Sequence, residues 1–198
     1  MTDWTRTALL LVDLQNDFLH PGGAYARGNA VSPEAAALPA HLAPLAAAVH
    51  RTGGLVAGTQ FTLVPGRGGE PMISPHLRQL RPFLRRGDFQ PGSWGHGVVA
   101  ELGPIDLLVE KVAYSAFYMT RLEWVLRRAG VERLVVGGIV TNGGVSSTVR
   151  DAHVRDMEVT VLSDGCAAPT PAMHATAIEA LRPVAAVATV AEVMESLA

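Results

Sequence analysis

The chain of 198 residues is poor in cysteine, in aromatic side chains and in excess charge of either sign. Its one cysteine, Cys166, cannot close a disulfide within the chain, and a zinc site made of several thiolates is excluded. The 16 lysines and arginines face 18 aspartates and glutamates, so the net charge is only −2. Because no basic stripe is present to neutralise phosphates, we expect no nucleic-acid partner.

Long apolar runs are also missing. The first run ends at Asp13, well short of the roughly 20 residues that cross a bilayer, and no signal peptide is evident. We therefore predict a cytoplasmic protein with no membrane partner. Hydrophobic residues still make up 48% of the chain, enough to bury a core, and no linker divides them. A single domain is expected over residues 1–198.

Short apolar runs alternate along the chain with amphipathic segments. The runs are continuous, which is typical of parallel strands covered on both faces. The predicted strands are residues 8–12, 55–61, 106–110, 133–139, 158–162 and 185–189. Strands that alternate with helices under right-handed crossovers predict an α/β fold, a Rossmann-like three-layer αβα sandwich around a six-stranded, mostly parallel sheet.

Helix starts are predicted where Ser or Thr precedes Pro or lies three residues before Glu. These starts are at Ser32, Thr120, Thr170 and Thr189. Residues 62–104 are rich in Gly and Pro and are expected to form a long loop with one or two short helices. Loops of that length in a compact domain are usually functional. Two roles are considered for this loop: a lid or substrate wall, and a contact between subunits.

Polar side chains follow several predicted strands at their carboxyl ends, where open parallel sheets bind ligands. Asp13 follows the first strand, Gln60 lies at the end of the second, and Lys111 follows the third. Because an unpaired buried charge is costly, Asp13 and Lys111 are expected to be partners. Each residue considered alone has an alternative: Asp13 as a helix N-cap or a loop carboxylate, and Lys111 as a strand-end lysine that reaches solvent.

Residues 137–145, Gly-Gly-Ile-Val-Thr-Asn-Gly-Gly-Val, end the fourth strand and open a helix. Free backbone N–H groups at a helix start attract negative charge. A glycine such as Gly143 lets a substrate approach the backbone closely. The stretch therefore suits a carboxylate or a developing oxyanion, and a tight turn is the alternative.

Three separate motifs, in order along nearly the whole chain, resemble the isochorismatase-like hydrolase superfamily, which has the cysteine hydrolase fold. They are Leu-Val-Asp-Leu-Gln-Asn-Asp-Phe at 11–18, Lys111 with Tyr-Ser-Ala-Phe at 114–117, and Gly-Ile-Val-Thr-Asn at 138–142 with Thr-Val-Arg-Asp-Ala at 148–152. Each motif stands at the strand end where this family carries it. The resemblance identifies the chain as a member and implies the same fold.

Most members of this superfamily have a catalytic Asp, Lys and Cys. The resemblance carries the first two onto Asp13 and Lys111 and the cysteine onto Gly144. The chain thus differs from the thiol branch at the position of its nucleophile. Cys166 follows a different strand and is not expected to replace it.

True isochorismatases also have glycine at this position, and they cleave a vinyl ether to pyruvate without a covalent enzyme adduct. The resemblance therefore implies a hydrolase in which Asp13 is the general acid and Lys111 holds a carboxylate or hydroxyl of the substrate. The missing side chain at Gly144 leaves room for the substrate ring. Because residues 140–142, Val-Thr-Asn, are similar to the amidase and nicotinamidase branch, the alternative is a thiol-lacking relative that binds a small ligand with little or no turnover.

The resemblance also implies a cis peptide between Ile139 and Val140, with backbone N–H groups that face the substrate. The expected substrate contacts are Gln60, Tyr114, Phe117, Val140, Thr141 and Gly143. For the two aromatic residues a place in the core is the alternative, and for the glutamine a solvent-facing strand end.

No metal and no cofactor are expected. Nicotinamidases of the superfamily hold a metal with an Asp and paired His residues beyond the second strand, and residues 60–62, Gln-Phe-Thr, provide none of these. The chain also has no glycine motif for a nucleotide. Members of the superfamily are commonly oligomeric, so the expected partners are a small-molecule substrate and further copies of this chain, in a homodimer or a higher homo-oligomer.

Overall fold

The computed structural model describes residues 3–197, in which six strands form one sheet in the order β3-β2-β1-β4-β5-β6. The strands are β1 Thr7–Val12, β2 Leu55–Phe61, β3 Leu107–Lys111, β4 Arg133–Ile139, β5 Glu158–Ala167 and β6 Ala186–Ala188. Every neighbouring pair is parallel. The predicted α/β sandwich is confirmed, and its sheet is parallel throughout.

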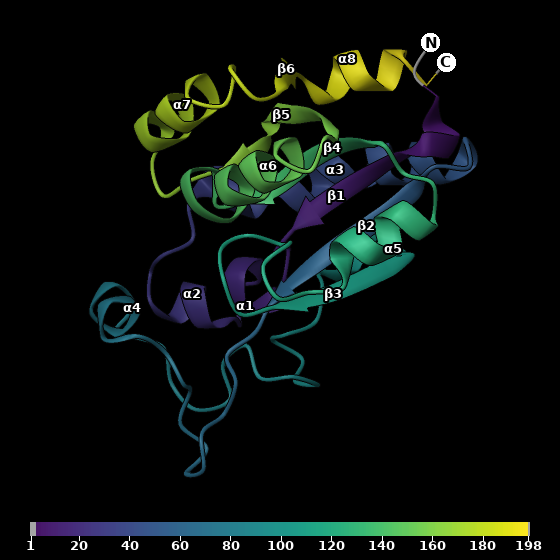
Figure 1. Ribbon diagram of the computed structural model, residues 1–198. Coiled ribbons are helices and arrows are strands. Elements are labelled where there is room, and N and C mark those ends of the chain that lie inside the picture. The colour runs from purple at the N-terminus through teal and green to yellow at the C-terminus, as the bar shows by residue number, and fades with distance from the viewer. Residues whose placement is uncertain (1–2, 198) are drawn as a thin grey trace.

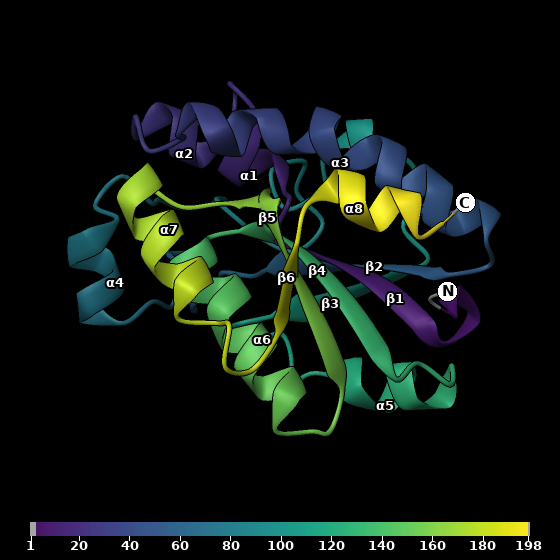
Figure 2. The same ribbon diagram turned by 90° about the horizontal axis from the view of Figure 1, so that it is seen from above.

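Helices cover both faces of the sheet. They are η1 Trp4–Arg6, α1 Asn16–Leu19, α2 Ala24–Arg27, α3 Pro33–Arg51, α4 Pro75–Leu80, η2 Ala100–Leu102, α5 Leu122–Arg128, η3 Thr141–Val145, α6 Ser146–His153, α7 Pro171–Glu179 and α8 Val190–Glu195. Figure 2 shows α3 and α8 on one face and α5 and α6 on the other. In β1, Leu9 and Leu11 pack in the first of these layers and Leu10 and Val12 in the second. Burial on both sides explains why the strand is apolar without alternation.

Most of the predicted helix starts are confirmed, and one is wrong. The Ser32 side chain caps α3, and Thr189 caps α8. At α5, however, the N-cap is Arg121, which makes no side-chain cap. The Thr120 hydroxyl donates to the Ala116 carbonyl at 2.6 Å, so it closes the turn before the helix. None of the helices within residues 3–197 is both long and apolar enough to cross a membrane.

The strand β5 is longer than predicted because its pairing with β4 is interrupted and then resumes. The register shifts between Val136 and Gly138, and beyond the shift Gly138 pairs with Cys166. Residues 163–165, Ser-Asp-Gly, have weak strand propensity, so the sequence alone indicated an earlier end. The added length places Ala167 beside the end of β4.

The long loop predicted over residues 62–104 is confirmed and contains the short helix α4. Asp17 ties this loop to the first motif, because its carboxylate accepts from the Phe89 N–H at 2.7 Å and from the Ala24 N–H at 3.0 Å. With α1, α2 and α4, the loop lies beyond the carboxyl ends of the strands (Figure 1). This arrangement encloses the end of the sheet at which ligands bind in open α/β folds.

Candidate active site

The ion pair predicted at the first and third strand ends is present. Lys111 Nζ lies 2.6 Å from Asp13 Oδ2, and the two side chains are 1% and 6% exposed. The Thr59 hydroxyl donates to Asp13 Oδ1 at 2.6 Å, and Lys111 Nζ also donates to the Ala113 carbonyl at 3.0 Å. Both oxygens of the buried carboxylate are therefore satisfied inside the protein.

Asp13 also has an unusual backbone conformation. Its φ of 58° lies in the left-handed region, which residues other than glycine rarely adopt. Such conformations cost about 1–3 kcal/mol and gather at functional sites. The chain turns sharply here, since the Gln15 N–H donates to the Asp13 carbonyl at 2.8 Å. The turn holds the carboxylate at the strand end and supports a functional role for it.

Gly144 lies directly beside this pair. A Cβ atom added to Gly144 would be 3.4 Å from Asp13 Oδ2 and 3.3 Å from the Val12 side chain. The glycine belongs to the π-helical turn η3, which joins β4 to α6. A side chain at this position would contact the Asp13 carboxylate, so the structure brings Asp13, Lys111 and Gly144 together.

The Ile139–Val140 peptide is cis, as the resemblance implied. Gly143 and Tyr114 lie next to it, since a Cβ atom on Gly143 would be 2.9 Å from the Val140 side chain and 3.2 Å from the Tyr114 ring. The Tyr114 side chain is 59% exposed. These residues therefore form an open edge of the site, and Tyr114 is not a core aromatic.

The end of β2 presents Thr59 to Asp13, where we expected Gln60. Successive strand residues point to opposite faces, and the Gln60 side-chain amide donates to the His96 carbonyl at 2.9 Å. Gln60 is thus engaged with the long loop and is separate from the ion pair. Sequence reasoning missed Thr59 because a threonine inside an apolar run has no distinguishing signal.

Two further predicted contacts, Thr141 and Phe117, are held inside the protein. Thr141 Oγ1 is 2.9 Å from His174 Nδ1, and His174 Nε2 is 2.8 Å from the Ser163 carbonyl oxygen. Phe117 is 5% exposed and packs in the core layer that contains α5. The guanidinium carbon of Arg155 lies 5.0 Å from the centre of its ring. Both side chains are thus held by contacts inside the protein.

A cavity of about 240 Å³ lies next to the cis peptide. Its lining includes Phe18, Tyr25, Arg81, Ile139, Val140 and Ala167. Neither Asp13 nor Lys111 lines it, but the Phe61 ring lies near both the cavity and the ion pair, because its centre is 6.0 Å from that of Phe18 and 5.6 Å from Lys111 Nζ. We take this cavity as the candidate substrate pocket.

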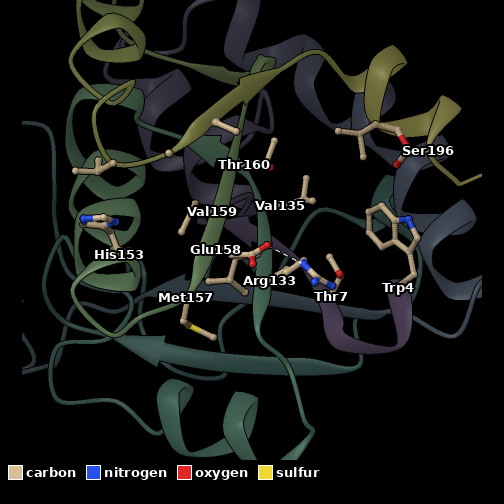
Figure 3. A pocket seen from close by; sticks show the side chains of 15 residues that line it. Trp4, Thr7, Arg133, Val135, His153, Met157, Glu158, Val159, Thr160 and Ser196 are labelled. Carbon is tan, nitrogen blue, oxygen red and sulfur yellow. Dashed lines mark hydrogen bonds and ion pairs between the residues drawn. The ribbon is translucent and has the colours of Figure 1, made fainter. Parts of the chain in front are cut away.

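A cavity of about 590 Å³ lies at the opposite, amino-terminal end of the strands. Figure 3 shows Trp4 and His153 on different sides of it, and its charged residues Arg133 and Glu158 paired with each other at 2.8 Å. No nucleophile lies beside a base among the residues that line it. Its larger volume therefore does not make it the better candidate, because the buried ion pair lies at the other end of the sheet.

His96, a buried residue of the long loop, was also missed from the sequence. It is 3% exposed, and its Nε2 lies 2.9 Å from Thr62 Oγ1. The side-chain amides of Gln15 and Gln60 both donate to its backbone carbonyl at 2.9 Å. Nothing in a loop rich in glycine and proline distinguishes this histidine. Within residues 3–197, no group of three or more His, Cys, Asp or Glu side chains is arranged to hold a metal ion.

We expect the stability of the protein to fall in mild acid because of His96. Burial lowers the pKa of its imidazole, against the opposing effects of the carboxylates of Glu110 and Asp17. The unfolded chain, with a histidine pKa of about 6.5, then binds the proton more readily than the native protein. The stabilisation is complete above that pH and is lost below it, by at most about 1.4 kcal/mol per pH unit.

Urea unfolding at pH 7.5 and 5.5 measures this change, with His96→Gln as the comparison that removes the titrating group. The variant should lose less stability between the two pH values than the wild type. An equal loss in the two proteins would show that other groups cause the acid sensitivity.

Cys166 is expected to be chemically inert in the native protein. It is buried, and burial raises the pKa of its thiol to about 12. Because the thiolate is the reactive form, native alkylation by iodoacetamide at pH 8 should be about a thousandfold slower than in the unfolded chain. Mass spectrometry of the labelled protein measures the rate. In Gly144→Cys, label at residue 144 but not at Cys166 would provide the internal control, and rapid native labelling of Cys166 would contradict the prediction.

Comparison with known proteins agrees with this fold. The family model for the isochorismatase domain matches residues 7–193. The ureidoacrylate amidohydrolase RutB of Pantoea ananatis (strain LMG 20103) is 33% identical over 170 residues, which is 80% of this chain and 68% of that protein.

Solved structures show the same fold. A cysteine hydrolase from Pseudomonas syringae pv. phaseolicola 1448A superposes with a TM-score of 0.84 at 26% identity, over 99% of this chain and 94% of that one. An N-carbamoylsarcosine amidase from Thermoplasma acidophilum gives a TM-score of 0.73 at 26% identity, over 93% of this chain and 96% of that one.

Proposed function

Because this chain belongs to the isochorismatase family of hydrolases, we propose that it cleaves a vinyl ether such as isochorismate by proton transfer from Asp13, without a covalent intermediate. One observation carries the proposal. Gly144 leaves no side chain at the place where a Cβ atom would lie 3.4 Å from Asp13 Oδ2. We propose that Gly144 takes the position of the family's nucleophilic cysteine, so that an acid remains where a nucleophile has been lost.

The chemistry requires only an acid and a water molecule. Asp13 must carry a proton when the substrate is bound. The π electrons of the C=C bond in a vinyl ether take this proton at the terminal carbon, and an oxocarbenium ion forms. Water adds to this ion and returns a proton to Asp13. The resulting hemiketal then breaks its C–O bond as its hydroxyl proton passes to the leaving oxygen, which releases pyruvate and an alcohol. No bond to the enzyme forms, so no thiol is needed.

Lys111 suits this reaction in two ways. Its ammonium group, 2.6 Å from Asp13 Oδ2, stabilises the carboxylate that remains after proton transfer. It also donates to the Ala113 carbonyl, which leaves one further N–H for a substrate carboxylate or hydroxyl. Thr59 holds the other carboxylate oxygen and thereby fixes the orientation of the acid.

A second candidate is a thiol-lacking relative of the amidases that binds a small ligand with little or no turnover. Two facts favour this candidate. The chain is similar to RutB, which is named as an amidohydrolase, and it has a glycine at the proposed nucleophile position. Covalent catalysis of amide hydrolysis needs a nucleophile. A chain that lost the thiol would keep the pocket and the ion pair but lose that route.

Incubation of the wild-type protein with isochorismate separates the two candidates, with pyruvate measured by a coupled lactate dehydrogenase assay. Release of pyruvate that persists after treatment with iodoacetamide supports the acid mechanism. Thermal stabilisation by isochorismate without any pyruvate supports the binding protein. Loss of activity on alkylation would show that a thiol takes part, contrary to both candidates.

A further inference from the structure

We propose that Arg81, held against Tyr25 in the cavity beside the cis peptide, binds a carboxylate group of the substrate, and that the chain acts on a small organic anion. The inference rests on the proposed function, because it names a group that the substrate of that site carries. Neither Arg81 nor Tyr25 belongs to the motifs that the sequence analysis singled out.

Arg81 and Tyr25 reach this cavity from two distant segments. Tyr25 lies on α2, and Arg81 directly follows α4 in the long loop. Figure 1 shows both helices beyond the carboxyl ends of the strands. The two side chains line the same cavity as Phe18, Ile139 and Val140. Arg81 therefore lines the same cavity as the end of β4.

The Arg81 guanidinium has donors to spare. Its Nε donates to the Tyr25 hydroxyl at 3.0 Å, and Nη1 donates to the Leu80 carbonyl at 3.0 Å. A guanidinium carries more N–H groups than these two contacts use. Among residues 3–197, no carboxylate lies within ion-pair distance of Arg81, whereas the nearby Arg27 is paired with Asp88 at 2.6 Å. A half-buried cation that lacks a carboxylate is suited to an anionic ligand.

Tyr25 supplies a second donor at the same place. Burial raises the pKa of its hydroxyl, and the charges of Tyr114 and Asp13 act in the same direction, against the effect of Arg81. The hydroxyl stays protonated at neutral pH, and because it accepts from Arg81 Nε its own proton remains free to donate.

The size and lining of the cavity define the ligand further. Its volume of about 240 Å³ is below the range of about 300–1,000 Å³ that is common for drug-sized ligands. Phe18, Val140 and Ala167 contribute apolar surface to its wall, and Asn29 and Ser32 contribute polar side chains. A small carboxylate with an apolar body fits these surroundings, with the acid group bound to Arg81 as a forked ion pair.

Isothermal titration calorimetry with matched acids and amides tests the proposal. The probes are benzoate against benzamide and pyruvate against pyruvamide, since each pair differs chiefly in charge. The wild type should bind at least one acid tighter than its amide, and Arg81→Gln should weaken that acid by tenfold or more while the amide changes less than twofold. Arg81→Lys should retain part of the preference because it keeps the charge.

Arg78→Gln provides the control, because it removes the same charge from an exposed position of α4 that does not line the cavity. It should bind the acids as the wild type does. Three results would overturn the proposal: equal loss of acid and amide binding in Arg81→Gln, unchanged acid binding in that variant, or no preference for either acid in the wild type.

The outcome is separable from that of the proposed function. If no pyruvate is released from isochorismate but acid binding still depends on Arg81, only the vinyl-ether hydrolysis is wrong. If pyruvate is released and Arg81→Gln leaves the KM for isochorismate unchanged, only the role of Arg81 is wrong.

Discussion

Asp13→Asn is expected to reduce the rate of pyruvate release from isochorismate by about a hundredfold to ten-thousandfold. Asparagine is nearly the same size and can still accept the hydrogen bond from Thr59, but it has no proton to transfer. The loss corresponds to the usual contribution of a positioned general acid. Steady-state kinetics should show the effect in kcat, with KM changed much less, since the pocket walls are unaltered.

Asp156→Asn is a matched control for this substitution. Asp156 is an exposed aspartate that also has a left-handed backbone, with φ of 59°, so the same chemical change is made in the same conformation away from the site. Its kcat should equal that of the wild type. An Asp13→Asn enzyme that retains full kcat would show that another group donates the proton, and the proposed mechanism would fail.

Lys111→Met is expected to lower the free energy of unfolding by about 3–5 kcal/mol. The substitution leaves the carboxylate of Asp13 buried, 6% exposed, without its cationic partner. Removing one member of a buried pair costs far more than the pair itself contributes, because the remaining charge stays desolvated. Urea denaturation at pH 7.5 measures the change.

The double variant Asp13→Asn/Lys111→Met separates the unpaired charge from other effects of losing the lysine. It should recover much of the lost stability, because neither charge then remains in the interior. Arg128→Met, which removes a cation from the exposed end of α5, should change stability by no more than about 0.5 kcal/mol. If Lys111→Met is as mild as this control, the ion pair has no structural importance.

Some features of the site could be predicted because they depend on local sequence and on the direction of the strands. Asp13 and Lys111 each follow an apolar run, and parallel strands bring their carboxyl ends to one edge of the sheet. Lys111 is also the single lysine of the chain. The position of Gly144 followed from its motif.

Other features depend on which face of a strand a residue occupies. Thr59, and not Gln60, contacts Asp13, because a shift of one residue along a strand reverses the direction of the side chain. Phe117 lies in the turn between β3 and α5 and packs in the core, since an aromatic residue after a strand end packs on whichever side offers apolar surface. Propensity and hydrophobic pattern do not determine these choices.

The sequence by itself determined the parallel α/β fold, the pairing of Asp13 with Lys111 and the absence of a side chain at Gly144 beside them. Each follows from continuous apolar runs, strand polarity or a contiguous motif, which are all properties of short segments. Only the tertiary structure decided that Arg81 and Tyr25 share a cavity and that His96 is buried. These contacts join residues from distant segments across an irregular loop. Their geometry depends on how that loop packs against α1 and α2, and no local pattern encodes it.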